Sequence, residues 1–158
     1  MLTQLNEIMT QLPSVVIEGK SYKPEFRYGT RLQLTEDLSL YRKKGERYYP
    51  LVYLETPING SEIVEFRFIL ATLNIRSDMR NKDRVGLTFT KVLEPLRKNL
   101  VKALLRSGVF KRVAATPKNE FSGEYHFNYN IQPDIWDALV YNTTFRYTPN
   151  CKVRIIKF

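Results

Sequence analysis

The stretch "YYPLVYLETPINGSEIVEFRFILATL", residues 48–73, decides the fold that this sequence predicts. Within it, residues 51–54 form a short continuous apolar run with a proline close to each end. Such a run is typical of a strand that is covered on both faces. Pro50 suits the first position of the strand and Pro57 its exit, because proline has no backbone N–H to donate to a sheet.

A turn and a second strand follow this run. The dipeptide Asn59–Gly60 is the strongest hairpin signal in the chain. Over residues 62–73, alternate positions form one apolar face, while the other face changes from charged to apolar along the strand. We therefore expect a hairpin near the middle of a sheet.

The aromatic residues of this region allow a second interpretation, because they follow the basic segment "RKKGER", residues 42–47. Aromatic side chains interleaved with cations can stack nucleic-acid bases. Most aromatic residues of the chain lie on the apolar face of an alternating strand, which predicts that they belong to the core. Tyr48 and Tyr49 are the exceptions, since they lie where the charged loop enters the strand.

A long helix is expected after the hairpin and the charged connection "NIRSDMRNKDR", residues 74–84. One apolar stripe runs from Phe89 to Leu104 at helical spacing. Pro95 should kink or divide this helix, but the stripe keeps its phase across the proline, which favours one kinked element. Gly108 lies where the C-cap is expected.

Apolar spacing predicts the other elements as well. They are a helix over 2–12, a connecting loop over 13–24, a half-buried strand over 25–35, a short helix or turn within 35–47, a strand over 124–131, a short helix opened near Pro133 and Asp134, and a last strand over 151–158.

This order of elements predicts an α+β fold. We expect a single mixed or mostly antiparallel sheet with a central hairpin, packed by one long kinked helix and shorter helices. The chain reads as one domain over 1–158, made of an N-terminal helix and connecting arm (1–24) and an α+β core (25–158).

Composition limits the classes of function. The chain has 158 residues, a formal net charge of +9 and a pI of about 9.7, which favours acidic partners such as nucleic acid, an anionic membrane or an acidic protein surface. Cys151 is the only cysteine, so no internal disulfide is possible. The first residues lack a secretion signal and no apolar run is long enough to cross a bilayer, so we expect folding in a cytoplasm.

A search for catalytic motifs finds none. One histidine and one cysteine cannot form a soft-metal site, and no phosphate-binding or nucleophile-elbow motif occurs. His126 reads as a surface residue on the polar face of its strand, and Asp134 and Asp137 read as charges favoured at a helix start. We therefore expect no enzyme activity, no cofactor and no metal.

The order of these sequence features resembles that of a known family. The pieces that carry the resemblance are "FRYG" and a "DL" turn, then "YPLVYLETP", "FRFILATLN" and "F…VLEPLRKNLVKALLRSGVF", and finally a Tyr–His–Phe strand and an Asp/Trp turn. In this order they resemble the tail terminator or tail-completion proteins of tailed bacteriophages, especially small neck proteins of phages that infect Bacteroides-type hosts. The resemblance covers about residues 25–158.

The resemblance implies an α/β sandwich and a structural protein of the virion, assembled in the bacterial host cytoplasm. Members form a ring, expected here as a hexamer or dodecamer, between the head connector and the tail tube. Adjacent neck, connector or tail proteins would be its partners, and genomic DNA would pass through the lumen without sequence recognition. No membrane is involved. The N-terminal helix lies outside the resemblance, so a tail terminator and a related ring of a short-tailed phage both stay open.

A ring subunit needs charged loops at its edges, and the two basic segments are the candidates. The residues expected to make contacts between subunits or rings are Arg42, Lys43, Lys44, Arg47, Tyr48, Arg76, Arg80, Lys82 and Arg84. The alternative function is a small basic nucleic-acid-binding module that uses the same loops together with Tyr48 and Tyr49.

Overall fold

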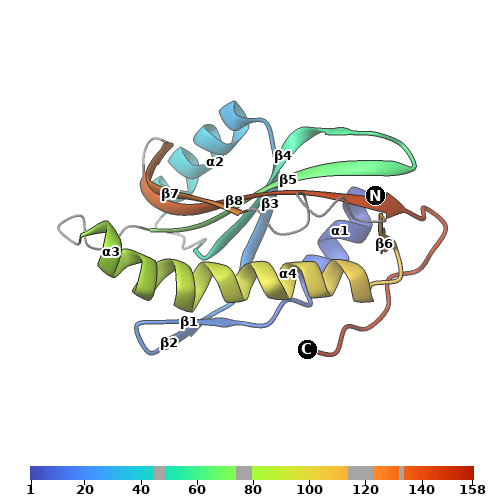
Figure 1. Cartoon of the computed structure of the whole chain (residues 1–158). Coiled ribbons are helices and arrows are strands. Elements are labelled where there is room, and N and C mark those ends of the chain that lie inside the picture. The colour runs from blue at the N-terminus through green and yellow to red at the C-terminus, as the bar shows by residue number, and fades with distance from the viewer. Residues whose placement is uncertain (45–48, 74–79, 114–122, 132–133) are drawn as a thin grey trace.

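A twisted sheet forms the middle layer of the molecule, as the computed structural model shows (Figure 1). The structure describes residues 1–44, 49–73, 80–113, 123–131 and 134–158. In chain order its elements are α1 (Leu2–Met9), β1 (Val15–Ile17), β2 (Lys20–Tyr22), β3 (Glu25–Gly29), α2 (Arg31–Lys44), β4 (Leu51–Asn59), β5 (Ile63–Leu73), α3 (Asn81–Arg84), the π-helix η1 (Val85–Leu93), α4 (Glu94–Arg106), β6 (Phe110–Arg112), β7 (Gly123–Ile131) and β8 (Asp134–Tyr147).

The main sheet has six strands in the order β3-β4-β5-β8-β6, and β7 also pairs with β8. The β3–β4 pair is parallel and the other pairs are antiparallel, so the α+β class and the mixed sheet are confirmed. The expectation of a single sheet is wrong, because β1 and β2 form a separate antiparallel pair. Residues 13–24 are thus a small hairpin rather than a loop, and it turns at Glu18 and Gly19, which both have positive φ.

The β4–β5 hairpin lies in the middle of the sheet, as predicted. Leu51, Val52, Tyr53 and Leu54 are at most 1% exposed, which confirms a strand covered on both faces. The strand does not end at Pro57, however, but continues to Asn59. The β4–β5 register shifts between Glu55 and Asn59, and the proline within that interval has no N–H to add to the ladder.

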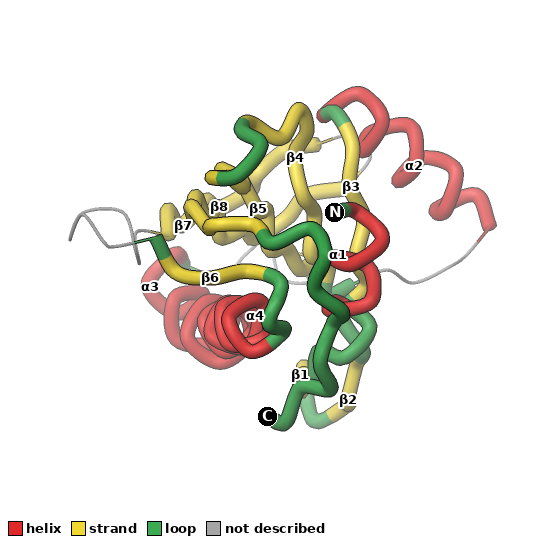
Figure 2. Tube along the Cα trace, turned by 90° about the vertical axis from the view of Figure 1, so that its right-hand side faces the viewer, coloured by secondary structure: helices red, strands yellow, loops and turns green. Residues whose placement is uncertain are grey.

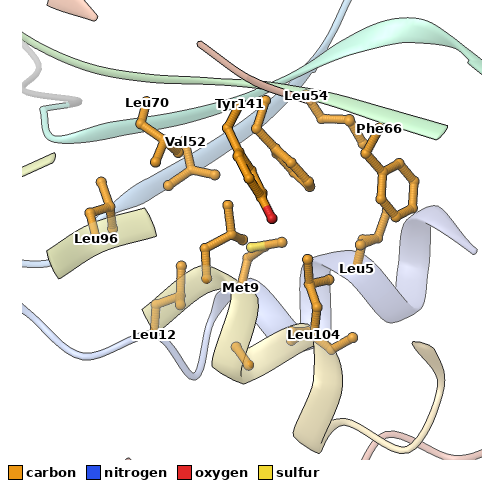
Figure 3. Close-up of a cluster of buried hydrophobic side chains, with 14 of the residues drawn as sticks. Leu5, Met9, Leu12, Val52, Leu54, Phe66, Leu70, Leu96, Leu104 and Tyr141 are labelled. Atoms are coloured by element: carbon orange, nitrogen blue, oxygen red, sulfur yellow. The ribbon is translucent and has the colours of Figure 1, made fainter. Parts of the chain in front are cut away.

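Helices α1 and α4 cover one face of the sheet, and α2 covers part of the other (Figure 2). On the first face, α1 and the residues after it contribute Leu5, Met9 and Leu12 to the core, and α4 contributes Leu96 and Leu104 (Figure 3). These side chains pack against Val52, Leu54, Phe66, Leu70 and Tyr141 of the sheet.

The second core is smaller and lies under α2. Leu34 and Leu38 of α2, one turn apart, contact a patch of the opposite sheet face. The sheet residues in this cluster are Leu51, Tyr53, Ile69, Ala71, Trp136, Ala138 and Val140. Alternate residues of each central strand therefore belong to different cores, which explains the continuous apolar run in β4.

The strand predicted over 25–35 is correct only as far as Gly29, because α2 begins two residues later. Gly29 has φ of +154°, and a Cβ there would lie 2.7 Å from Gln33 Oε1. The Thr30 N–H donates to Gln33 Oε1 at 2.8 Å, and the Gln33 N–H donates to Thr30 Oγ1 at 3.3 Å. This reciprocal capping box starts the helix, and it overrides the alternation of apolar residues.

The long helix is one continuous element, as expected, although it begins at Asn81 inside the predicted charged connection (Figure 1). A π-helical stretch, η1, occupies residues 85–93, and α4 follows with Pro95 in its first turn. Pro95 therefore lies inside a continuous helix, and the irregularity that accompanies it is the π-helical stretch directly before it, in which the Glu94 N–H bonds to the Phe89 carbonyl. Gly108 follows the helix with φ of +79°, which confirms the predicted C-cap glycine.

The segment "PDIWDALV" is strand rather than helix. It begins β8, which pairs with β5 from Leu73↔Trp136 to Ile63↔Arg146 and has β6 and β7 on its other side. Burial on both faces produces the run of apolar residues that looked helical at short range. Asp137 accordingly lies inside the fold and is no helix-start charge.

The C-terminal residues 151–158 form no strand. They run between α1 and α4 and are held by hydrogen bonds to both (Figure 2). The Arg154 N–H donates to the Ser107 carbonyl at 3.0 Å, and the Ile156 N–H donates to Gln11 Oε1 at 2.8 Å. β6 is the edge strand beside this end of β8, and no described residue of the C-terminal segment pairs with it.

Candidate functional site

The two basic segments predicted as contact loops attach to the same end of the sheet. The pair Leu51↔Ala71 places the start of β4 beside the end of β5, and Leu73↔Trp136 places that end beside the start of β8. In Figure 1 the last turn of α2 and the start of α3 lie toward this end. We call it the loop end.

The candidate residues divide into three groups. Arg42, Lys43 and Lys44 belong to the last turn of α2. Arg80 and Lys82 are exposed at the start of α3. Arg47, Tyr48 and Arg76 lie outside the described residues.

Arg84, the ninth candidate, is not a surface contact. Its side chain is 3% exposed and forms an ion pair with Asp137, whose side chain is 2% exposed. Arg84 Nε donates to Asp137 Oδ2 at 3.1 Å, and the guanidinium lies 5.2 Å from the centre of the Phe127 ring. Burial lowers the pKa of the Arg84 guanidinium. This ion pair holds the start of the long helix against β8. A run of charged residues in the sequence is usually a solvated loop, so the sequence alone does not show that Arg84 is buried.

Tyr49 is a core residue at the rim of the sheet. Its hydroxyl accepts a hydrogen bond from Trp136 Nε1, and the two rings meet edge to face with centroids 6.0 Å apart. The ring is half-buried. Tyr49 is therefore engaged with the second core through its hydroxyl and one side of its ring.

The β3 edge of the sheet is open among the described residues, as is the opposite edge formed by β6 and β7. β3 pairs with β4 on one side and with no described strand on the other. Tyr28 on this edge is 44% exposed, and Leu32 in the first turn of α2 is 68% exposed. An edge strand beside exposed apolar groups is a surface suited to pairing with another chain. The strand predicted over 25–35 did not reveal these residues, because the alternation of apolar residues predicts a buried position for both side chains.

The sheet face beside α2 carries a polar depression of about 540 Å³. Glu55, Glu65 and Arg67 line it together with Asn142 and Thr144. Arg67 Nε lies 2.9 Å from Glu55 Oε2 in a half-exposed ion pair. Because Arg67 and Glu55 already pair with each other at a half-exposed position, we assign no chemistry to this depression.

Two tyrosines have altered pKa values. Burial, followed by the negative charges of Asp37 and Glu55, raises the pKa of Tyr53 to about 12, and its hydroxyl donates to the Thr30 carbonyl at 2.8 Å. Burial and a 2.9 Å hydrogen bond to Glu94 Oε1 raise the pKa of Tyr125. The raised pKa values hold both phenols protonated, so neither site favours a phenolate nucleophile.

Within the described part of the chain, no three His, Cys, Asp or Glu side chains are grouped so that they could hold a metal ion. His126 Nε2 lies 3.3 Å from Glu124 Oε2 on the exposed side of β7. Over the same residues, no helix combines the length and apolar character needed to span a bilayer.

Comparisons with known proteins add no relative. No family model matches the chain. A search of the curated proteins finds no match either.

Proposed function

We propose that this protein is a structural subunit of a tailed-phage virion, which assembles into a closed ring in the neck or tail. The ring joins the head connector to the tail and surrounds the DNA channel. In this proposal the chain contributes rigid shape and contact surfaces and carries out no reaction. Its partners are further copies of itself and the adjacent neck or tail proteins.

The observation that carries the proposal is the loop end. Both basic segments attach at this end of the sheet, because α2 precedes the start of β4 and α3 follows the end of β5, although the two helices lie on opposite sides of the sheet (Figure 2). A surface of this kind suits contact with an acidic surface of a neighbouring subunit or ring. The open β3 edge with Tyr28 and Leu32 provides a second, different surface. Two unlike surfaces on one subunit suit the head-to-tail contacts that close a ring.

The test is a quadruple variant with Arg42, Lys43, Lys44 and Arg47 replaced by glutamine. We expect the fold to survive, because a strongly basic sequence segment is expected at the surface, where substitutions usually change stability by less than about 0.5 kcal/mol each. Ring closure or docking to the neighbouring component should fail, so that DNA-filled heads accumulate without stably attached tails. Particle assembly is measured by electron microscopy and infectivity.

The matched control removes the same number of charges elsewhere, at Lys20, Lys111, Arg146 and Lys152, which are all exposed. This control variant should assemble normally. Normal particles from the loop-end variant would contradict the proposal.

A small basic nucleic-acid-binding module is the second candidate, since the same gathering of basic segments and the +9 charge favour it. This second function predicts a monomer that binds a defined nucleic acid tightly. If it contacts six or more phosphates, its affinity should fall roughly 10³-fold or more when the salt concentration rises from 50 to 200 mM. If the only defect of the quadruple variant is the loss of such binding, this second function is correct. Weak, non-specific DNA binding is expected of either candidate.

A further inference from the structure

We propose that the exposed face of α4, together with the C-terminal segment, is a docking surface for an acidic amphipathic helix of a partner protein. This surface lies at the end of the long helix opposite the loop end (Figure 1). The inference does not depend on ring assembly, and it concerns none of the residues on which that proposal rests. We call the surface the α4 basic groove and define it by Lys98, Val101, Lys102, Leu105 and Arg106.

The cations of the groove form a regular row. Lys98, Lys102 and Arg106 are four residues apart, so they follow one another along the same side of α4 at intervals of about 6 Å. Lys98 and Arg106 are exposed and Lys102 is half-buried. Glu94 is the last acidic residue of α4, and Arg97 binds it at 2.7 Å. Glu94 lies four residues before Lys98, so the one carboxylate of α4 is at the end of this row, where Arg97 already pairs with it.

An apolar furrow runs beside this row. It has a volume of about 350 Å³ and is lined by Val101 and Leu105 and by the stems of the basic side chains. Its walls are almost entirely apolar, since lysine and arginine expose their carbon stems here while the charged groups lie at the rim. Both Val101 and Leu105 are half-buried, so their exposed sides are available to a partner.

The C-terminal segment extends the same surface. It is fixed beside α4 by the Arg154–Ser107 backbone hydrogen bond and by a hydrogen bond from Arg106 to the Lys157 carbonyl. It adds two exposed cations, Arg154 and Lys157, and an isoleucine, Ile155, that is 88% exposed. From Thr148 to Phe158 the sequence contains no acidic side chain.

The cations and the apolar groups of the α4 basic groove together determine which kind of partner fits it. An acidic helix with carboxylates at four-residue spacing matches the intervals of the row, and an apolar stripe beside its carboxylates fits the furrow and Ile155. A phosphate backbone would satisfy the cations but would leave the furrow and Ile155 against charged groups. A membrane surface would need a broad apolar face to insert, whereas the main apolar face of α4 is buried against the sheet.

The binding experiment uses the full chain and a synthetic peptide of about 18 residues, long enough to form an isolated helix. The peptide carries glutamate at every fourth position beside a stripe of leucines, with alanine elsewhere, and fluorescence anisotropy measures its affinity. Lys98→Gln, Lys102→Gln and Arg106→Gln together should weaken binding about tenfold or more, as expected for three exposed ion pairs. The matched control, with Lys111, Arg146 and Lys152 replaced by glutamine, should bind like the wild type.

A charge-reversed variant completes the test. With Lys98, Lys102 and Arg106 replaced by glutamate, the chain should prefer a peptide that carries lysine in place of each glutamate. Three outcomes would overturn the proposal: no binding of the acidic peptide by the wild type, equal binding of a scrambled peptide of the same composition, or tighter binding to a DNA duplex or to anionic vesicles that the first triple variant loses.

Discussion

At the scale of single residues, the buried ion pair between Arg84 and Asp137 is the most consequential feature that the sequence hides. Two full charges lie within the fold at 3% and 2% side-chain exposure. Removing one partner leaves the other charge buried without compensation, whereas replacing both by apolar residues is often neutral. The pair is therefore a constraint on how α3 meets β8 more than a source of stability.

Asp137→Ala should lower the free energy of unfolding by about 3–5 kcal/mol, and the double change Arg84→Met with Asp137→Leu should recover most of the loss. Chemical denaturation measures both. The control is Arg67→Gln, which breaks the half-exposed Arg67–Glu55 pair and should cost at most about 1 kcal/mol. Equal effects of Asp137→Ala and Arg67→Gln would show that the buried pair has no special role.

Tyr53 gives a prediction about pH. Its pKa is about 12 in the folded chain and 10.0 as the ordinary value, so the folded state keeps the proton longer than the unfolded state. The stability contribution of Tyr53 is complete below pH 10 and is lost as the pH rises through 12, with a slope of up to about 1.4 kcal/mol per pH unit. Tyr53→Phe should flatten this alkaline loss of stability. Tyr28→Phe, at an exposed position, is the control for the loss of one hydroxyl group. If the stability of the wild type and of Tyr53→Phe falls in parallel as the pH rises, Tyr53 is not the cause of the alkaline loss of stability.

At the scale of elements, the correct predictions concern turns and helices that are determined by residues close together in the sequence. The Asn59–Gly60 turn, the stripe of the long helix and the glycine at its C-terminus all depend on neighbouring residues, and all were predicted correctly. The start of α2 is also determined by nearby residues, since Thr30 and Gln33 form a capping box. It was not predicted, because the alternation of apolar residues over 25–35 favoured a strand there.

The elements that failed depend on distant partners. "PDIWDALV" is a strand because β5 and β7 cover its edges, and no residue within the segment reveals those neighbours. The C-terminal segment has a strand-like composition but hydrogen bonds to α1 and to the end of α4 instead. Of the nine candidate contact residues, Arg42, Lys43 and Lys44 lie in α2, Arg80 and Lys82 are exposed at the start of α3, Arg84 is buried, and the remaining three lie outside the described residues.

Two glycines test how the long helix is built. Gly108→Ala should destabilise the chain by about 1 kcal/mol, because φ of +79° disfavours any side chain and a Cβ would lie 2.9 Å from Arg154 Nε. Gly86→Ala should be neutral or stabilising by up to about 1 kcal/mol, since it is helical and a Cβ there meets nothing within 4 Å. Thermal unfolding of the two variants measures both effects. A loss of stability in Gly86→Ala equal to that in Gly108→Ala would contradict this description of the helix.

At the scale of the whole molecule, the fold offers contact surfaces in different directions. Each face of the sheet carries its own core, so we expect contacts with other molecules at the loop end, the β3 edge and the α4 basic groove. This arrangement suits a component that is held on several sides at once, which is the function that we propose.

The most direct test of that function is the mass of the purified chain under native conditions, measured by mass spectrometry and combined with electron microscopy of the same sample. We predict a single closed species whose mass is a whole multiple of 18.6 kDa and whose images are rings with a central channel. A species of 18.6 kDa alone, at every concentration measured, would contradict the proposal.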